Sequence, residues 1–149
     1  MSKGEIEVMA RGVCIVQGRL LLCHTRGADN TYLPGGHVDF GEPAARALCR
    51  EIREELGLKA RTGRFLGVVE HVYRQKGRRH CEVNLVFELR IAGLGSDAPP
   101  PSAEGHLDFR WARATPRALR AAGLEPAPLC ALIPAWSRGA PPAHASTLP

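Results

Sequence analysis

Alternating apolar and polar positions predict β-strands in both halves of the chain. Segment 6–16, "IEVMARGVCIV", alternates loosely and is rich in β-branched residues, and the tight turn "QGR" joins it to the apolar segment 20–25. Two longer candidates, 64–74 and 80–91, are joined by the basic turn "QKGRR", and 106–112 alternates again. These patterns predict a strand-rich protein containing hairpins.

Helix signals occur at three places. The segment "AARALCREIREEL" contains no Gly or Pro, and it is preceded by Pro43, which fits a first helical position, and followed by Gly57, which fits the left-handed position past a helix end. Thr115 before Pro116 predicts an N-cap and the start of a second helix. A last helical segment is expected at 128–136.

The resulting order, β-rich, helix, β-rich, helix, lacks the strict βαβ alternation of a doubly wound parallel sheet. It favours a mixed β-sheet flanked by helices, described as α+β or as an α/β/α sandwich. The length of 149 residues suits one domain, which we assign to residues 1–136. The Pro/Ala/Ser-rich tail 137–149 is expected to be disordered.

Composition narrows the class of protein. Hydrophobic residues make up 44% and charged residues 23%, as in a soluble globular protein, and no apolar run reaches the roughly 18–20 residues that span a bilayer. The N-terminal segment lacks a signal-peptide core, so we expect a cytoplasmic protein without a membrane partner. The five cysteines form no C-x-x-C pair, so reduced, packed thiols are expected rather than a zinc site; a reactive thiol is the alternative. The net charge of +5 favours anionic partners but does not choose between nucleotides and nucleic acid.

The first predicted helix carries carboxylates where a helix disfavours them. With about 100° between successive residues, Glu51, Glu54 and Glu55 share one stripe about 100° wide, beside an apolar stripe that faces the core. The helix dipole disfavours negative charge in the last turn by up to about 1 kcal/mol, and two carboxylates about 6 Å apart repel by roughly 0.7 kcal/mol even in water. A solvated acidic face is the ordinary interpretation of such a stripe. A bound cation explains its position better, and oxygen ligands without His or Cys favour Mg²⁺ or Mn²⁺ over zinc.

The same segment resembles the signature of the Nudix hydrolases, G-x5-E-x7-R-E-U-x-E-E-x-G-U, in which U is a bulky aliphatic residue. Every constrained position is filled, by Gly36, Glu42, Arg50, Glu51, Ile52, Glu54, Glu55, Gly57 and Leu58. The flanking order of strands, "LPGG" and "FRWA" are also similar to this family, so the resemblance spans roughly residues 5–136.

The resemblance implies an α/β/α sandwich that hydrolyses a nucleoside diphosphate linked to another group, by attack of water on phosphorus. It implies that Glu51, Glu54 and Glu55 coordinate Mg²⁺, with Mn²⁺ as a possible substitute, that one of them is a candidate base, and that the Gly35 carbonyl completes the metal site. Glu42 and Arg50 resemble the residues that steer the catalytic glutamates, and we include Arg50 among the catalytic residues.

Family members often use a further acidic residue from outside the signature. Glu104, in the Pro/Gly-rich loop 93–105, is our candidate as an additional catalytic residue, and the alternative is a solvated loop carboxylate. Glu70 and Glu82, on predicted strands, are weaker candidates.

Other features have two interpretations each. The basic run 74–80 is expected to be a solvated hairpin turn, with phosphate binding as the alternative. His37 is a candidate substrate contact, and Tyr32, Phe40 and Trp111 are candidates for stacking on a base, with a core position favoured for Trp111. The remaining aromatic residues expected mainly in the core are Phe65, Phe87, Phe109 and Trp136.

The substrate is left open by the sequence. The proline typical of the ADP-ribose subgroup and the long signature of the NADH subgroup are absent. Nucleoside triphosphates, dinucleotides, nucleotide sugars and 5′-triphosphorylated RNA remain, and a free nucleotide is favoured because short members commonly act on one. An RNA 5′-end pyrophosphohydrolase and a noncatalytic nucleotide- or RNA-binding module are the alternatives. A homodimer is possible by resemblance to the family.

Overall fold

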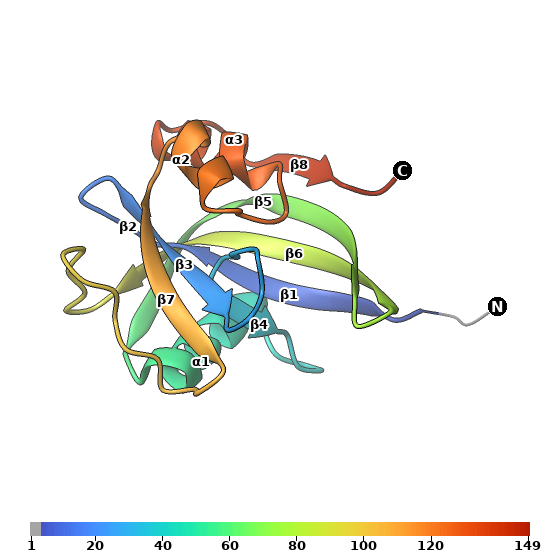
Figure 1. The fold of residues 1–149 in the computed structure, drawn as a ribbon, viewed down its shortest axis with the longest axis horizontal. Coiled ribbons are helices and arrows are strands. Elements are labelled where there is room, and N and C mark those ends of the chain that lie inside the picture. Colours follow the sequence, from blue (N-terminus) through green and yellow to red (C-terminus); the bar gives the residue numbers. More distant parts are fainter. Residues whose placement is uncertain (1–3) are drawn as a thin grey trace.

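The computed structural model describes residues 4–149, which form two β-sheets with helices on both sides (Figure 1). In chain order the elements are β1 (Ile6–Val13), β2 (Ile15–Val16), β3 (Arg19–Thr25), β4 (Gly35–His37), α1 (Ala44–Leu56), β5 (Ala60–Gln75), β6 (Arg78–Ile91), β7 (Leu107–Arg113), α2 (Pro116–Ala121), α3 (Leu129–Ser137) and β8 (Ala143–Ser146).

The larger sheet has the strand order β4-β1-β6-β5-β8 and the smaller one β2-β3-β7. The β1–β6 and β5–β8 pairs are parallel, whereas the remaining pairs are antiparallel. In Figure 1, α1 lies below the strands, and α2 and α3 lie above them. The predicted mixed sheet flanked by helices is therefore confirmed.

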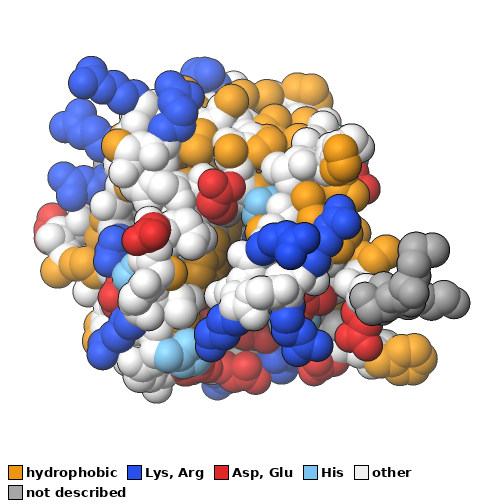
Figure 2. All heavy atoms as spheres, turned by 45° about the vertical axis from the view of Figure 1, so that its right-hand side comes forward, with side chains coloured by type: hydrophobic (Ala, Val, Ile, Leu, Met, Phe, Trp, Pro, Cys, Tyr) orange, Lys and Arg blue, Asp and Glu red, His pale blue; other side chains and the backbone are white. Residues whose placement is uncertain are grey.

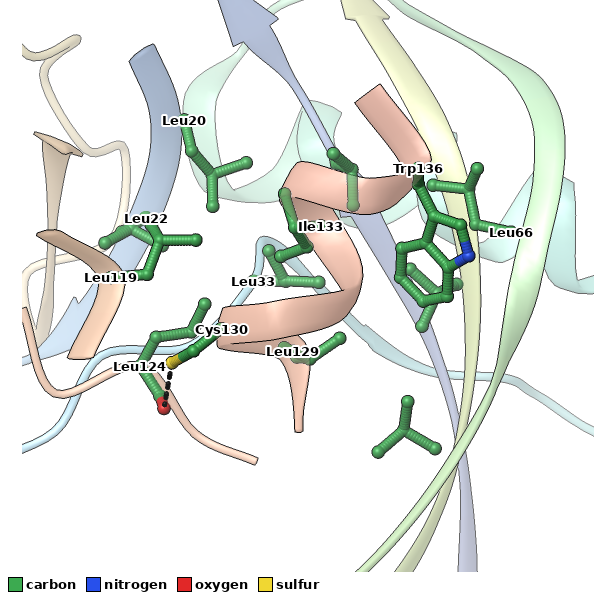
Figure 3. Packing of buried hydrophobic residues seen from close by; sticks show 13 residues of the cluster. Leu20, Leu22, Leu33, Leu66, Leu119, Leu124, Leu129, Cys130, Ile133 and Trp136 are labelled. Carbon is green, nitrogen blue, oxygen red and sulfur yellow. Dashed lines mark hydrogen bonds between the residues drawn. The ribbon is translucent and has the colours of Figure 1, made fainter. Parts of the chain in front are cut away.

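The hydrophobic core has one layer on each side of the strands. On the α1 side, Leu48 and Ile52 pack with Leu21 of β3. On the other side, Ile133 and Trp136 of α3 belong to a cluster with residues of β3, β5 and α2 (Figure 3). This two-layer burial fixes α1 against the sheet, and α1 carries the carboxylates.

The ends of the first two helices agree with their sequence signals, with one shift. Gly57 has φ 67° and donates its backbone N–H to the carbonyl of Arg53, so it is the predicted left-handed C-cap. Pro43 has extended backbone (ψ 136°) and is the N-cap, so the first helical residue is Ala44 rather than Pro43. The Thr115 hydroxyl accepts the N–H of Ala118 and caps α2 as predicted.

The single strand expected at 6–16 is wrong, because the chain changes sheet near Cys14. β1 pairs with β6 in the larger sheet, and β2 pairs with β3 in the smaller one. Both pieces bury apolar side chains, so the hydrophobic pattern continues through the change of sheet and does not reveal it.

The disordered tail expected at 137–149 is also not what the structure shows. Within this segment β8 pairs in parallel with residues Gly67–Glu70 of β5, and Ala143 and Ala145 pack against the α3 side of the core. The tail lacks large apolar side chains, which is why composition predicted disorder. Backbone hydrogen bonds to a sheet edge and close packing of small side chains hold it instead.

The remaining expectations on side-chain burial are mostly met. All five cysteines are free, with Cys14, Cys23 and Cys130 buried. Phe109 and Trp136 are core residues, but Phe65 is 40% exposed and meets Phe87 edge-on, so its assignment to the core is wrong. Within residues 4–149, no helix is both long and apolar enough to cross a membrane.

Substituting Gly67 with Ala is expected to detach β8. Gly67 has φ 153°, and an added Cβ would collide with the backbone carbonyl of Ala143. We expect Gly67→Ala to lower the free energy of unfolding by roughly 1–3 kcal/mol and to accelerate amide exchange across residues 143–147. Gly95→Ala is the control, because its Cβ would meet no atom within 4 Å. Unchanged exchange in the tail would contradict the role assigned to Gly67.

Candidate functional site

The guanidinium of Arg50 is the centre of the hydrogen-bond network around α1. It binds Glu42 in bidentate fashion, with Nε–Oε1 2.9 Å and Nη2–Oε2 3.0 Å. Nη1 donates to Glu51 at 3.1 Å and to Glu54 at 3.2 Å, while Nη2 donates to the carbonyl of His37 at 3.0 Å. These bonds raise the pKa of Arg50, with Glu42 contributing most, and Arg50 in turn lowers the pKa of Glu42.

The loop between β4 and α1 is tied to the helix through Glu42. Its Oε2 accepts the backbone N–H of Asp39 at 3.1 Å in addition to the bond from Arg50. A carboxylate held by a bidentate guanidinium and a backbone N–H has a fixed orientation. The loop therefore enters α1 at one defined angle.

Gly36 is required by the position of Glu51. A Cβ on Gly36 would lie 2.6 Å from Oε1 of Glu51, and it would also collide with the carboxylate carbon. The absence of a side chain at Gly36 lets the carboxylate lie directly against β4. Burial raises the pKa of Glu51, and the bond from Arg50 opposes that shift.

Glu55 is a buried carboxylate at the end of α1. The residue is 5% exposed, and its Oε2 is fully buried and accepts no hydrogen bond from any part of residues 4–149. Burial raises the pKa of Glu55 to about 8, and the nearby charges of Glu51 and Glu104 add to the shift. The backbone N–H of Gly35 and the guanidinium of Arg11 act in the opposite direction. A buried carboxylate oxygen without a partner is costly, and Oε2 of Glu55 is such an oxygen.

The three glutamates do not form a preassembled metal cage. Across the described residues 4–149, no three His, Cys, Asp or Glu side chains are grouped closely enough to hold an ion. Two of the three, Glu51 and Glu54, are instead bonded to Nη1 of Arg50. The available ligand atoms nevertheless suit a hard divalent ion, because all are carboxylate oxygens. One of them, Oε2 of Glu55, has no hydrogen-bond partner in the described residues.

Of the acidic residues considered outside the signature, only Glu104 lies at this end of α1. The backbone N–H of Ala103 donates to the carbonyl of Glu55 at 2.7 Å, and the Glu104 carboxylate is close enough to raise the pKa of Glu55. Glu70 is instead paired with His144 at 2.8 Å on the β8 edge. Glu82 is buried in the floor of a neighbouring cavity.

A cavity of about 640 Å³, a volume suited to a small-molecule ligand, is lined in part by Arg11 and His37, and both residues also interact with the network around α1. Its floor is one face of the larger sheet, made of alternate residues of β1, β6 and β5: Glu7, Met9, Arg11, Val86, Asn84, Glu82, His80, His71 and Tyr73. The space-filling view shows acidic, basic and histidine side chains interspersed on one face of the molecule (Figure 2).

Arg11 joins the cavity to the carboxylate cluster. Its Nε donates to Asn84 Oδ1 at 3.3 Å, its Nη1 donates to the carbonyl of Leu33 at 3.1 Å, and its guanidinium lies 5.3 Å from the ring centre of Tyr32. It also favours the ionised forms of Glu51 and Glu55. The sequence analysis missed Arg11 and Asn84. Both lie on strands where polar residues recur at alternate positions, a pattern that a strand with one solvent-facing side also shows.

The aromatic and basic residues that the sequence suggested as substrate contacts lie in three kinds of position: the cavity, the exposed surface and the core. Tyr32 and His37 line the cavity, whereas Phe40 is fully exposed in the loop before α1. Trp111 packs against the α1 side of the core, and its indole N–H donates to the carbonyl of Ala98 at 3.0 Å. The basic run 74–80 forms the turn of the β5–β6 hairpin, as expected.

Comparison with known proteins identifies relatives of this architecture. The sequence profile of the NUDIX domain matches residues 7–125. The human protein diphosphoinositol polyphosphate phosphohydrolase 3-beta is 39% identical over 70 residues, which cover 47% of this chain and 43% of that protein, so the chain spans less than half the length of this curated relative.

Solved structures agree with the fold. A MutT NUDIX hydrolase from Burkholderia pseudomallei is 29% identical, with a TM-score of 0.57, and covers 74% of this chain and 84% of its own. The MutT protein from Methanosarcina mazei Go1 has a TM-score of 0.67 at 19% identity over 93% of this chain and 97% of its own, which shows a shared fold.

Replacing Glu55 with Gln is expected to stabilise the metal-free protein at alkaline pH. Because the pKa of Glu55 is raised from 4.5 to about 8 on folding, the folded state retains a proton that the unfolded state loses, so wild-type stability falls as the pH rises from 4.5 to 8. In chelator at pH 8.5, Glu55→Gln should raise the free energy of unfolding by an amount on the order of a few kcal/mol. The difference should vanish near pH 4.5.

The matched control is Glu54→Gln, since the side chain of Glu54 is 49% exposed and its neutralisation removes no buried charge. Denaturant unfolding across this pH range measures both variants. A destabilised Glu55→Gln at pH 8.5 would show that the carboxylate already has a partner within the protein.

Proposed function

The chain belongs to the NUDIX domain family, and on that premise we propose that it is a divalent-metal-dependent pyrophosphohydrolase acting on a nucleoside diphosphate linked to another group. The observation that carries the proposal is the unpartnered, buried oxygen of Glu55 beside Glu51 and next to a ligand-sized cavity. A noncatalytic module would have no need to maintain this costly cluster.

We assign Glu51, Glu54 and Glu55, with the carbonyl of Gly35, to a Mg²⁺ site in which Mn²⁺ can substitute. When bound, the ion supplies positive charge that polarises a phosphoryl oxygen and favours ionisation of water. Glu51 and Glu54 would hold the ion, and both are hydrogen-bonded to Arg50. Arg50 stays anchored through its bidentate bond to Glu42 and holds both glutamates in place.

Glu104 is our candidate for the group that accepts a proton from the attacking water. It lies near Glu55, it is partly exposed, and its only ion-pair partner in residues 4–149 is His106 at 3.5 Å. A base needs access to solvent and a position close to the reacting phosphorus. Glu70 does not meet the second condition, because it is paired on the β8 edge.

The adjoining cavity would receive the group attached to the diphosphate. We favour a free nucleotide or nucleotide derivative, hydrolysed in the cytoplasm, where free thiols such as those observed persist. The name of the human relative refers to diphosphoinositol polyphosphates, and its match covers less than half of either chain. A triphosphorylated RNA 5′ end is the second candidate, since Arg74 lines the cavity and the basic turn follows directly.

The decisive experiment is a panel of nucleoside triphosphates, dinucleotides, nucleotide sugars and triphosphorylated RNA, assayed with Mg²⁺ or Mn²⁺ and with product identification. We expect metal-dependent release of a nucleoside monophosphate or of phosphate, and a loss of about 10²-fold or more in kcat for Glu54→Gln and Glu55→Gln. Glu88→Gln, on β6 beside Arg64, is the control. The absence of turnover across the panel would refute the proposal.

Arg11 is expected to bind a substrate phosphate. Its guanidinium is fixed by Asn84, Leu33 and the Tyr32 ring. It lines the cavity and favours the ionised forms of Glu51 and Glu55. Preorganised donors of this kind typically contribute about 10²-fold to a rate. Arg11→Met should therefore lower kcat/KM by roughly that factor, and Arg11→Lys should recover little, because Lys lacks the planar fork. Arg90→Met, at an exposed position of β6, is the control. Wild-type kinetics in Arg11→Met would exclude the phosphate contact.

A further inference from the structure

Three flat side chains form a stack in the cavity floor. The ring centres of His71 and Tyr73, both on β5, are 5.2 Å apart with 22° between their planes. The ring of His80, opposite Tyr73 on β6, continues the stack at 4.9 Å and 10°. The stack lines the cavity toward the end away from Arg11, because Tyr73 pairs with His80, beyond the Glu7–Glu82 pair, whereas Arg11 pairs with Val86.

Each ring in the stack is held by a different element. The Tyr73 hydroxyl donates to Glu82 Oε1 at 3.0 Å. Nδ1 of His80 lies 3.2 Å from Glu7 Oε2, and Glu7 also binds His37 at 2.8 Å. The third anchor comes from the C-terminal segment, because Nδ1 of His71 lies 2.9 Å from the Thr147 hydroxyl.

Thr147 itself is fixed by the backbone of β5. Its hydroxyl accepts the N–H of Val72 at 3.1 Å, and its own N–H donates to the carbonyl of Glu70 at 3.0 Å. The parallel strand β8 precedes it, with an ion pair between His144 and Glu70 at 2.8 Å. The hydroxyl therefore occupies one position, and it fixes the rotation of the His71 ring.

We propose that Thr147 is a positioning residue for substrate selectivity, which acts by fixing His71 and so the His71–Tyr73–His80 stack against which a nucleobase packs. This inference rests on the proposed function, in that the base belongs to the nucleotide whose phosphates meet the carboxylate cluster. Thr147 does not touch the base. Its effect on binding is indirect and passes through the orientation of the His71 ring.

The charges around the stack favour a flat, uncharged ring over a polyphosphorylated one. Glu7, Glu82 and Glu125 all line the cavity, against the guanidinium groups of Arg11 and Arg74. Burial lowers the pKa of His71, which disfavours a positive charge on its ring. A cyclitol carrying several phosphates would face these three carboxylates, whereas a base gains stacking without that repulsion.

The test compares Thr147→Val, which removes only the hydroxyl, with Thr147→Ser, which keeps it. Ser146→Ala is the control, because the Ser146 hydroxyl contacts only the backbone of Leu148. Calorimetry in chelator measures the affinity of each protein for the four common nucleoside 5′-monophosphates and for inorganic pyrophosphate. Nitrogen NMR of the His71 ring reports directly on the Thr147 contact.

We expect Thr147→Val to weaken binding of the preferred monophosphate about tenfold, the usual scale for one lost hydrogen bond to a binding group. Pyrophosphate affinity should change less than twofold, the His71 ring signals should shift, and Thr147→Ser should restore both properties. In turnover, KM for the preferred nucleotide should rise with little change in kcat. Equal losses for nucleotide and pyrophosphate, or no loss for either, would overturn the inference.

The two proposals fail in different ways. If wild-type protein binds monophosphates selectively but hydrolyses nothing in the substrate panel, the proposed function fails and the role of Thr147 is still decided by calorimetry. If it hydrolyses nucleotides but Thr147→Val retains the wild-type affinity, only the role of Thr147 fails.

Discussion

The bidentate ion pair between Arg50 and Glu42 determines most of the geometry of the site. It joins the first half of α1 to the loop that leaves β4, so the helix and the strand have one relative position. In that position Gly36 lies against Glu51 with no room for a side chain, and Arg50 reaches both Glu51 and Glu54. The repulsion between the carboxylates of α1 is therefore offset to different degrees at the three glutamates. Arg50 compensates two of them, and the third, Glu55, is buried with one carboxylate oxygen, Oε2, that accepts no hydrogen bond from the described residues 4–149.

How far the sequence could predict this molecule depends on whether an interaction is local. The caps of α1, the hairpin turn at 76–77 and the carboxylate face of the helix depend on residues a few positions apart, and their signals were readable. The change of sheet at Cys14 and the ordering of β8 depend on partners far away in sequence, and neither leaves a local pattern. Arg11 and Asn84 are a further case, because a polar residue on alternate strand positions is indistinguishable from an ordinary solvent-facing one until the fold forms a cavity above it.

One face of the larger sheet is part of the hydrophobic core at one end and lines the cavity at the other. Near α3 its side chains are apolar, and Val69 and Val86 belong to the core. Farther along the same strands, the positions that face the same way become Asn84, Glu82 and His71, which line the cavity. A binding surface built on paired strands is more rigid than one built on loops. Under the proposed function, the reaction depends on α1 and recognition depends on β1, β5 and β6, so the two lie on different elements of the fold.

The parallel pairing of β8 also has a consequence for self-association. The outer strand of a sheet exposes unpaired backbone groups that can recruit another chain. In this molecule the middle of β5, residues Gly67–Glu70, is covered by β8, which is short and ends in small and polar side chains. The C-terminal strand therefore covers part of an edge that would otherwise be open to another chain, and it directly precedes Thr147, which contacts His71.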